Sequence, residues 1–399
     1  MRLALLTTSD LDAPSPRGRW LPLGRELVRH GYQVSLLMTH PTFDRLPRHE
    51  RHGRIDGVMT HYVAQMHTYG PPGARRYFSP LALLRVALQG ALALAWATIR
   101  ARPQAIHLCK PQPINGLAGL IAARALGCPL YVDCDDYEAG NNRFSGAWQQ
   151  RIVQLFEDQL PRRAAGVTVN TSFLAERCRS QGVAETQIVY VPNGIAVAQL
   201  QAPNAHAVAQ LRATLGLNGQ QVVLYVGTLS EVSHHVGLLL EAFALLQDQL
   251  PTARLLLVGD GDDRALLEQR ARALGIAGRT QFMGRVAATL VPLYFGLAAC
   301  SVDPVADTPV AQGRSPLKIV ESLAAGVPVV TGAVGDRPLM LDHGSAGVLT
   351  AAGSAHALAE GIAHLLANEQ LQRSMAAGAQ RQAERYRWDR LALDWLALY

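Results

Sequence analysis

Strand and helix signals alternate along the whole chain, and the pattern restarts after Asn193. Alternation of this kind predicts parallel sheets that carry helices on both faces. A chain of 399 residues is also too long for one ordinary hydrophobic core. The predicted fold class is therefore α/β, with two Rossmann-like doubly wound domains. The expected strands are residues 3–7, 34–38, 106–109, 130–132 and 167–169 in the first half, and 222–226, 255–258, 280–282 and 327–330 in the second.

Residues 315–330 combine a helix start, a helix and a strand. Ser315 is a good N-cap and Pro316 a good first helical residue. Gly326 and Pro328 end the helix before an apolar run. The backbone N–H groups at a helix start favour a bound phosphate. The segment therefore predicts a phosphate site, and an ordinary amphipathic helix before a strand is the alternative.

Two charged residues sharpen this prediction. Lys318 and Glu321 are three positions apart and lie on one face of the expected helix. A cation near the helix start can neutralise a diphosphate, and a carboxylate one turn on can accept both hydroxyls of a ribose. The spacing therefore indicates a site for a nucleoside diphosphate.

The same segment resembles the nucleotide-sugar signature of family 4 retaining glycosyltransferases, enzymes with the two-domain GT-B fold. Further segments resemble motifs of this family in the family's order. They are Val191-Pro-Asn-Gly-Ile195 at the interdomain turn, Leu224-Tyr-Val-Gly-Thr-Leu229 with Leu238-Leu-Leu-Glu-Ala-Phe243 in the donor domain, and the turns in Leu256-Leu-Val-Gly-Asp-Gly261 and Phe282-Met-Gly-Arg-Val286. The resemblance implies an acceptor-binding domain at 1–192 and a donor-binding domain at 193–385, facing across a cleft. It also implies that residues 386–399 pack back on the first domain.

The resemblance implies transfer of a sugar from a nucleoside-diphosphate sugar to an acceptor hydroxyl, with no metal or other cofactor required. It places Glu321 on the ribose, Lys318 and the helix start on the diphosphate, and the turn after residue 284 beside the base. The implied donor-binding residues are Gly18, Gly227, Thr228, His234, Arg285, Val286, Arg314, Ser315, Pro316, Leu317, Lys318 and Glu321. For Gly18, a simple turn is an equal alternative.

Three positions depart from the family pattern. Thr228 stands where relatives carry an Arg, Ser233-His-His235 stands where a Lys is expected, and Gly313 replaces the first member of the paired-glutamate motif. Lys318 is then the residue expected to neutralise the charge of the diphosphate, with help from Arg314 or His234. The favoured reading is an active enzyme. A binding-only protein with a degraded donor site and a GT-B-fold epimerase acting on the nucleotide sugar stay open.

An acidic cluster, Tyr131-Val-Asp-Cys-Asp-Asp-Tyr-Glu138, follows a predicted strand. Carboxylates this close perturb one another's pKa values and attract a cation or sugar hydroxyls. In relatives this strand end carries a histidine near the reacting sugar, so Asp135 and Asp136 are the candidate catalytic residues together with Lys318. Asp133-x-Asp135 also matches the metal-binding D-x-D motif of the GT-A fold. That fold has a single domain and cannot account for the donor-binding motifs in the second half of this chain. A solvated helix cap is the remaining alternative.

Charge is unevenly distributed. Residues 1–190 contain 22 Lys and Arg against 14 Asp and Glu, a balance of +8, whereas residues 191–399 contain 15 against 17, a balance of −2. The basic half predicts an anionic partner, either acidic lipid headgroups or a phosphorylated acceptor; an arginine-rich solvated face is the alternative. No recognition motif for nucleic acid is present. The expected partners are a nucleoside-diphosphate sugar and an acceptor glycan, lipid-linked sugar or small molecule.

The longest apolar stretch, residues 79–102, is interrupted by Arg85 and Gln89. It is read as a helix packed into the first domain, with a surface helix that touches membrane as the next reading and a membrane span as the least favoured. The preceding loop, 67–78, mixes aromatic residues with Arg75 and Arg76, which suits either a lipid interface or a flexible acceptor loop.

The cysteines and the first residues bear on the compartment. The five cysteines are scattered and form no C-x-x-C, which favours reduced thiols over disulfides or a zinc site. The apolar start of the chain is too short for a signal-peptide core and reads as a buried strand. We therefore expect a cytoplasmic protein, with contact to the inner face of the membrane through the basic half.

Overall fold

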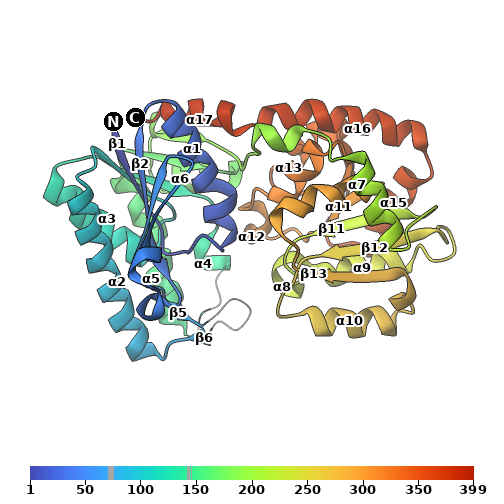
Figure 1. The fold of residues 1–399 in the computed structure, drawn as a ribbon, viewed down its shortest axis with the longest axis horizontal. Coiled ribbons are helices and arrows are strands. Elements are labelled where there is room, and N and C mark those ends of the chain that lie inside the picture. Colours follow the sequence, from blue (N-terminus) through green and yellow to red (C-terminus); the bar gives the residue numbers. More distant parts are fainter. Residues whose placement is uncertain (71–75, 142–143, 145) are drawn as a thin grey trace. The chain divides into compact units, whose positions relative to one another are not determined.

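The computed structural model describes residues 1–70, 76–141, 144 and 146–399 (Figure 1). The chain forms two compact units. Unit 1 consists of Met1–Asn193 and Trp388–Tyr399, and unit 2 of Gly194–Arg387. The first boundary lies one residue from the position expected from the sequence, and the second lies two residues from it.

Unit 1 is built on an eight-stranded sheet with the strand order β10-β9-β8-β7-β1-β2-β4-β3. All neighbouring strands are parallel except β3 and β4, which pair antiparallel at one edge. A small antiparallel pair, β5 and β6, is separate from it. The strands are β1 (Arg2–Leu6), β2 (Gln33–His40), β3 (His52–Ile55), β4 (Val58–Gln65), β5 (Thr68–Tyr69), β6 (Arg76–Tyr77), β7 (Ala105–Leu108), β8 (Leu130–Cys134), β9 (Gly166–Val169) and β10 (Ile188–Tyr190).

Helices cover both faces of this sheet. One apolar core lies under α2, α3, α5 and α6, and the other lies under α1 and α17. Strands β1, β7 and β8 are buried along almost their whole length, as expected for parallel strands covered on both faces. The helices are α1 (Leu21–Arg29), α2 (Pro80–Ala101), α3 (Pro113–Leu126), α4 (Glu138–Asn141), α5 (Ala147–Arg163), α6 (Ser172–Ser180) and α17 (Trp388–Leu396).

The last helix of the chain is held in unit 1 by aromatic and polar contacts. α17 packs on α1, and Trp395 stacks on the buried His107 of β7 with ring centres 4.3 Å apart. The Tyr399 hydroxyl is 2.8 Å from His107 Nδ1 and accepts a hydrogen bond from Trp395 Nε1 at 2.8 Å. Burial lowers the pKa of His107 to about 3, so this imidazole is neutral in the core.

A buried ion pair anchors the centre of unit 1. Arg19 and Asp133 are almost fully buried and form two hydrogen bonds of 2.7 Å. Asp133 also accepts hydrogen bonds from Trp20 Nε1 and Thr168 Oγ1 at 2.8 Å each. Arg19 donates further to the carbonyl of Val191 at 2.9 Å. The network therefore ties the segment after β1 to the end of β8 and to the last residues of unit 1 before unit 2.

Unit 2 is a six-stranded, entirely parallel sheet with the order β13-β12-β11-β14-β15-β16. The strands are β11 (Gln221–Val226), β12 (Ala253–Val258), β13 (Thr280–Gly284), β14 (Cys300–Asp303), β15 (Val329–Gly332) and β16 (Gly347–Thr350). The helices are α7 (Ala205–Thr214), α8 (Glu231–His234), α9 (Val236–Ala244), α10 (Arg264–Ala273), α11 (Val291–Leu297), α12 (Pro309–Gln312), α13 (Leu317–Ala324), α14 (Arg337–Met340), α15 (Ala355–Leu366) and α16 (Glu369–Ala383). The strand order reverses beside β11, where β12 and β14 flank it, and such switch points are the usual ligand sites of doubly wound sheets.

The predicted fold class is confirmed, and each predicted strand overlaps an observed one. The sequence reading missed β14 and β16 in unit 2. In unit 1 it missed β10, the β5–β6 pair and the antiparallel edge formed by β3 and β4. Gly18 was predicted as a donor-binding residue, with a simple turn as an equal alternative. This residue lies in a helical turn, Pro16–Trp20, that leads directly into α1, because Pro16 takes the first position of that turn.

Candidate functional site

The carboxyl ends of the unit 2 strands meet the start of α13. The helix begins at Leu317, with Pro316 as its N-cap in an extended conformation and without a side-chain cap. The prediction that Ser315 is the N-cap was therefore wrong by one residue, because the ψ of Pro316 is 111° and excludes it from the helix. The predicted helix end is confirmed. Gly326 has φ +68°, and its N–H donates to the carbonyl of Leu323.

Lys318 lies between an aromatic ring and a buried carboxylate. Its Nζ is 3.2 Å from Asp303 Oδ1, at the end of β14, and 4.4 Å from the centre of the Tyr225 ring, in β11. The other oxygen of Asp303 accepts a hydrogen bond from Arg337 Nε at 2.8 Å. Two cations and one carboxylate leave a single excess positive charge. The charge of Lys318 is thus shared with Asp303 before any ligand arrives.

Burial and pairing set the titration of this group. Burial raises the pKa of Asp303, but the nearby charges of Arg337 and Lys318 lower it by more. The net pKa of Asp303 therefore lies well below its usual range. The pKa of Lys318 is lowered, because burial outweighs the attraction of Asp303. Asp303 therefore remains ionised at neutral pH and fixes the position of the Lys318 ammonium.

The turn after β11 approaches Lys318 closely at Gly227. Gly227 has φ +153°, and a Cβ built there would lie 3.0 Å from Tyr225 Oη and 3.2 Å from Lys318 Cε. The Tyr225 hydroxyl donates to the carbonyl of the exposed Thr228 at 2.7 Å. Only glycine leaves both the backbone and the Lys318 side chain in place. Gly227 and Thr228 therefore lie at the same strand-end site as Lys318, as the sequence predicted.

Two further predicted residues lie near this turn. Arg314, half-buried, donates to the carbonyl of Ser233, and His234 follows directly in α8. Burial, with smaller contributions from Lys318 and Arg314, lowers the pKa of His234 to about 3. The imidazole of His234 is therefore uncharged at neutral pH, and the positive charge near the turn comes from Arg314 and Lys318.

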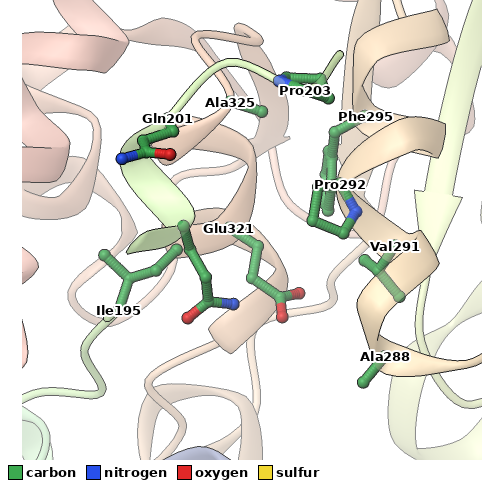
Figure 2. Close-up of a pocket in the computed structure, with 10 residues that line it drawn as sticks. Ile195, Gln201, Pro203, Ala288, Val291, Pro292, Phe295, Glu321 and Ala325 are labelled. Atoms are coloured by element: carbon green, nitrogen blue, oxygen red, sulfur yellow. The ribbon is translucent and has the colours of Figure 1, made fainter. Parts of the chain in front are cut away.

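Glu321 lies one turn along α13 and lines a separate pocket (Figure 2). Its carboxylate reaches toward α11, which contributes Val291, Pro292 and Phe295 to the apolar wall. Burial raises the pKa of Glu321 to about 7, and Lys318 opposes this effect. The pocket thus combines the Glu321 carboxylate and the amide side chains of Gln199 and Gln201 with the apolar surface of α11.

The remaining predicted donor residues lie at the same edge of the sheet or close to the pocket. Arg285 and Val286 follow β13 directly, Arg285 exposed and Val286 half-buried. Ala288, three residues after Arg285, lines the Glu321 pocket. Gly313, where the family carries a glutamate, is buried between α12 and α13.

In unit 1, the predicted acidic residues gather around a lysine that the sequence reading missed. Lys110, two residues after the end of β7, lies 3.1 Å from Asp135, 4.0 Å from Asp136 and 2.5 Å from Glu138. Gln112 Nε2 donates to the second oxygen of Glu138 at 2.6 Å. Burial raises the pKa of Asp135 to about 7; Lys110 lowers it, and the neighbouring carboxylates raise it. This cluster lies at the carboxyl edge of the unit 1 sheet, where ligands of doubly wound domains bind.

Two signals mark Lys110. Its φ is +144°, a conformation that non-glycine residues rarely adopt and that is found most often at functional sites. The chain also contains only two lysines, Lys110 and Lys318, beside its many arginines. The structure places one lysine at the strand ends of each unit. Counting lysine apart from arginine would therefore have found Lys110 in the sequence.

Asp133, the first residue of the alternative D-x-D reading, accepts hydrogen bonds from protein donors at both carboxylate oxygens. Both oxygens of Asp133 accept hydrogen bonds from Arg19, and Trp20 and Thr168 add two more. Within the described ranges, no group of three His, Cys, Asp or Glu side chains is arranged to hold a metal ion. Gly18, half-buried in its helical turn, belongs to unit 1, whereas the other proposed donor residues belong to unit 2.

Comparison with known families covers both units. The family model described as "Glycosyl transferase 4-like domain" matches residues 17–194, and the one described as "Glycosyl transferases group 1" matches residues 209–382. The chain belongs to the group 1 glycosyltransferases. The predicted membership of the glycosyltransferase family is thereby confirmed.

Relatives of this glycosyltransferase include the D-inositol 3-phosphate glycosyltransferase of Jonesia denitrificans, 27% identical over 72% of this chain and 69% of the relative. The phosphatidyl-myo-inositol mannosyltransferase of Mycobacterium leprae is 30% identical over 58% of each chain. The match thus spans little more than half the length of the mycobacterial relative.

Solved structures show the same fold. Sucrose-phosphate synthase from Thermosynechococcus elongatus superposes with a TM-score of 0.78 at 21% identity, covering 100% of this chain and 98% of the other. HepE from Anabaena, solved in complex with UDP-glucose, superposes with a TM-score of 0.74 at 20% identity, covering 98% and 97%. The GT-B fold predicted for this glycosyltransferase is confirmed.

Proposed function

We propose that the protein is a retaining glycosyltransferase that moves a sugar from a nucleoside-diphosphate sugar to an acceptor hydroxyl. The observation that carries the proposal is the placement of Lys318 and Glu321 on one helix, Lys318 at the strand ends and Glu321 in the neighbouring pocket. HepE from Anabaena, which has the same fold, has been solved with UDP-glucose. In this scheme the Glu321 carboxylate accepts hydrogen bonds from the ribose hydroxyls, and the base binds in the pocket beside Ala288.

The proposed chemistry is electrostatic. The start of α13 and the ammonium of Lys318 stabilise the negative charge that develops on the departing diphosphate. Arg314 adds a second cation, and His234 adds a neutral hydrogen-bonding group. The leaving phosphate helps to deprotonate the acceptor on the same face of the sugar, so that no protein nucleophile is required. Asp135 and Asp136 orient the acceptor in unit 1.

A panel of nucleoside-diphosphate sugars tests the function. A bound donor stabilises the native state and should raise the melting temperature. Product analysis without added acceptor then separates the alternatives. An isomerised nucleotide sugar would indicate the epimerase, and binding without transfer to any glycan, glycolipid or phosphorylated acceptor would indicate the binding-only protein. The binding-only alternative is included because Gly313 and Thr228 replace charged residues of the family pattern.

Glu321→Gln is expected to weaken donor binding by about tenfold to a hundredfold, because the ribose diol loses a charged acceptor. Binding to the wild type should also depend on pH. The carboxylate binds when ionised, and its pKa is about 7, so affinity should fall about tenfold per pH unit below 7 and level off above 8. Isothermal titration calorimetry between pH 5.5 and 8.5 checks both effects. If the variant bound the donor as tightly as the wild type, or kept the same pH profile, Glu321 would not be the residue that binds the ribose.

Turnover is expected to survive chelation of divalent metal. Lys318 and the helix start can neutralise a diphosphate without a metal ion, and the D-x-D residue Asp133 is occupied by Arg19. Initial rates measured with and without EDTA check this. Complete loss of activity, restored by manganese, would show that a metal takes part.

The acceptor and the location are further proposals. A lipid-linked or phosphorylated acceptor suits the +8 balance of residues 1–190, and the mycobacterial relative is named for phosphatidyl-myo-inositol. We propose a cytoplasmic enzyme that contacts the inner face of the membrane through unit 1. Arg75 of the basic loop lies outside the described residues, and Arg76 is exposed in β6.

A further inference from the structure

The outer side of α2 presents a continuous apolar stripe. Exposed side chains recur every three or four residues, as one helix face requires. They are Leu81 (83% exposed), Leu84 (63%), Leu88 (54%), Leu92 (53%) and Trp96 (64%). Among the described residues, α2 is the one helix that is long and apolar enough to cross a membrane. Only 28% of its most apolar 18-residue segment is buried in the protein.

Two neighbouring helices extend this surface. α3 packs beside α2, and α5 packs beside α3, on the same face of the sheet (Figure 1). Leu117 and Ile121 are exposed on α3 at a spacing of four. Trp148, Ile152 and Leu155 are exposed on α5 at spacings of four and three. We call the ten exposed apolar side chains of α2, α3 and α5 the apolar face. Solvent-exposed apolar patches of this extent mark interaction sites.

The exposed charged side chains of α2, α3 and α5 are all arginines, and the two carboxylates of α5, Glu157 and Asp158, are paired with Arg177. Arg85 on α2, Arg124 on α3 and Arg151 on α5 are exposed and lie in register with the apolar residues of their helices. Residues 57–132 contain seven Lys and Arg but no Asp or Glu. The face therefore combines apolar surface with unopposed positive charge, the composition of a surface that lies in the headgroup region of an anionic bilayer.

We propose that the apolar face docks unit 1 on a lipid bilayer rich in anionic headgroups, with α2 lying in the membrane plane. This identifies the surface that makes the membrane contact suggested under the proposed function. A span is excluded by packing, because the other side of α2 buries Gly90, Ala91, Leu94 and Ala95 against the sheet. Pairing with a second copy of the same face is disfavoured by charge, because a symmetric contact brings arginines together. Residues 57–132 contain no carboxylate to oppose them, and the carboxylates of α5 are already paired with Arg177.

Vesicle co-sedimentation with the full chain tests the proposal. The wild type should pellet with vesicles that contain phosphatidylglycerol and not with phosphatidylcholine alone. Leu88→Glu/Leu92→Glu should weaken binding at least about a hundredfold, because two apolar anchors become charged. Arg85→Gln/Arg124→Gln should weaken it about ten- to thirtyfold and remove most of its salt dependence.

Matched controls come from unit 2. Leu266, 52% exposed on α10, is almost as exposed as Leu92, and Leu266→Glu should bind vesicles like the wild type. Arg272 and Arg381 are exposed helix residues, and Arg272→Gln/Arg381→Gln should leave binding within about twofold, since both lie outside the face. All variants should retain the wild-type melting temperature and donor affinity by calorimetry.

Three results would overturn the proposal. They are equal pelleting with anionic and neutral vesicles, wild-type binding by Leu88→Glu/Leu92→Glu, and a concentration-dependent dimer in sedimentation velocity that this variant abolishes, which would make a second copy the occupant. Because vesicle binding needs neither donor nor turnover, its failure would leave the glycosyltransferase proposal untouched, and failure of donor binding would leave the docking surface untouched.

Discussion

Asp133→Asn is expected to lower the free energy of unfolding of unit 1 by about 3–5 kcal/mol, because it leaves the buried Arg19 without a counter-charge. Asp133 is fully buried, and its two oxygens accept hydrogen bonds from Arg19, Trp20 and Thr168. The asparagine keeps the size of the side chain but not its charge. The cost is therefore electrostatic rather than a packing loss.

Tryptophan fluorescence in a urea titration measures this effect in unit 1 alone. The five tryptophans are Trp20, Trp96, Trp148, Trp388 and Trp395, and all belong to unit 1. The matched control is Asp56→Asn. Arg25 and Asp56 form an ion pair of the same 2.7 Å length, but their side chains are 34% and 64% exposed, so its loss should cost less than about 1 kcal/mol. Equal costs for the two variants would show that burial does not govern the Arg19–Asp133 pair.

Lys318→Ala is expected to lower kcat/KM by about a hundredfold to a thousandfold, since it removes the cation that faces the departing diphosphate. The loss should be larger than from charge alone, because Asp303 then lies at the site with only Arg337 to balance it. Lys318→Arg should recover part of the activity. Steady-state kinetics over a range of donor concentrations separates a fall in kcat from a rise in KM.

The small number of lysines gives a direct readout of this site. In protein labelled with ¹⁵N-lysine, Lys110 and Lys318 are the only side-chain ammonium groups, and each belongs to a different unit. Donor should shift the Lys318 signal. A wild-type rate for Lys318→Ala, or a donor that shifts only the Lys110 signal, would place the diphosphate elsewhere.

The sequence was sufficient for the architecture, because apolar runs and helical periodicity are local signals. Strand β14 was missed for the same reason. Its four residues, Cys300–Asp303, are buried, but they follow Ala298 and Ala299 and contain the polar residues Ser301 and Asp303. Short polar strands of this kind are specified by their neighbours in the sheet rather than by their own pattern.

The candidate site was predictable where it is contiguous and not where it depends on tertiary contact. Lys318 and Glu321 could be paired from helix spacing alone. The contact of Lys318 with Asp303 joins a strand to a helix fifteen positions later, and Arg337 approaches from a third element. Similarly, the acidic cluster at residues 133–138 was visible, but its neutralisation by Lys110 requires that β7 and β8 be neighbours.

The packing of α17 has a consequence for synthesis. Unit 1 is completed by Trp388–Tyr399, so its core under α1 lacks Trp388, Trp395 and Tyr399 until the whole of unit 2 has been translated. At about 5–20 residues per second, translation from Asn193 to Tyr399 takes about 10–40 s. During that interval the nascent chain carries an unfinished first unit with His107 and its apolar neighbours uncovered. Unit 2, contiguous from Gly194 to Arg387, can finish folding first, and a chaperone that acts on this chain would find its binding site in the half that was made earliest.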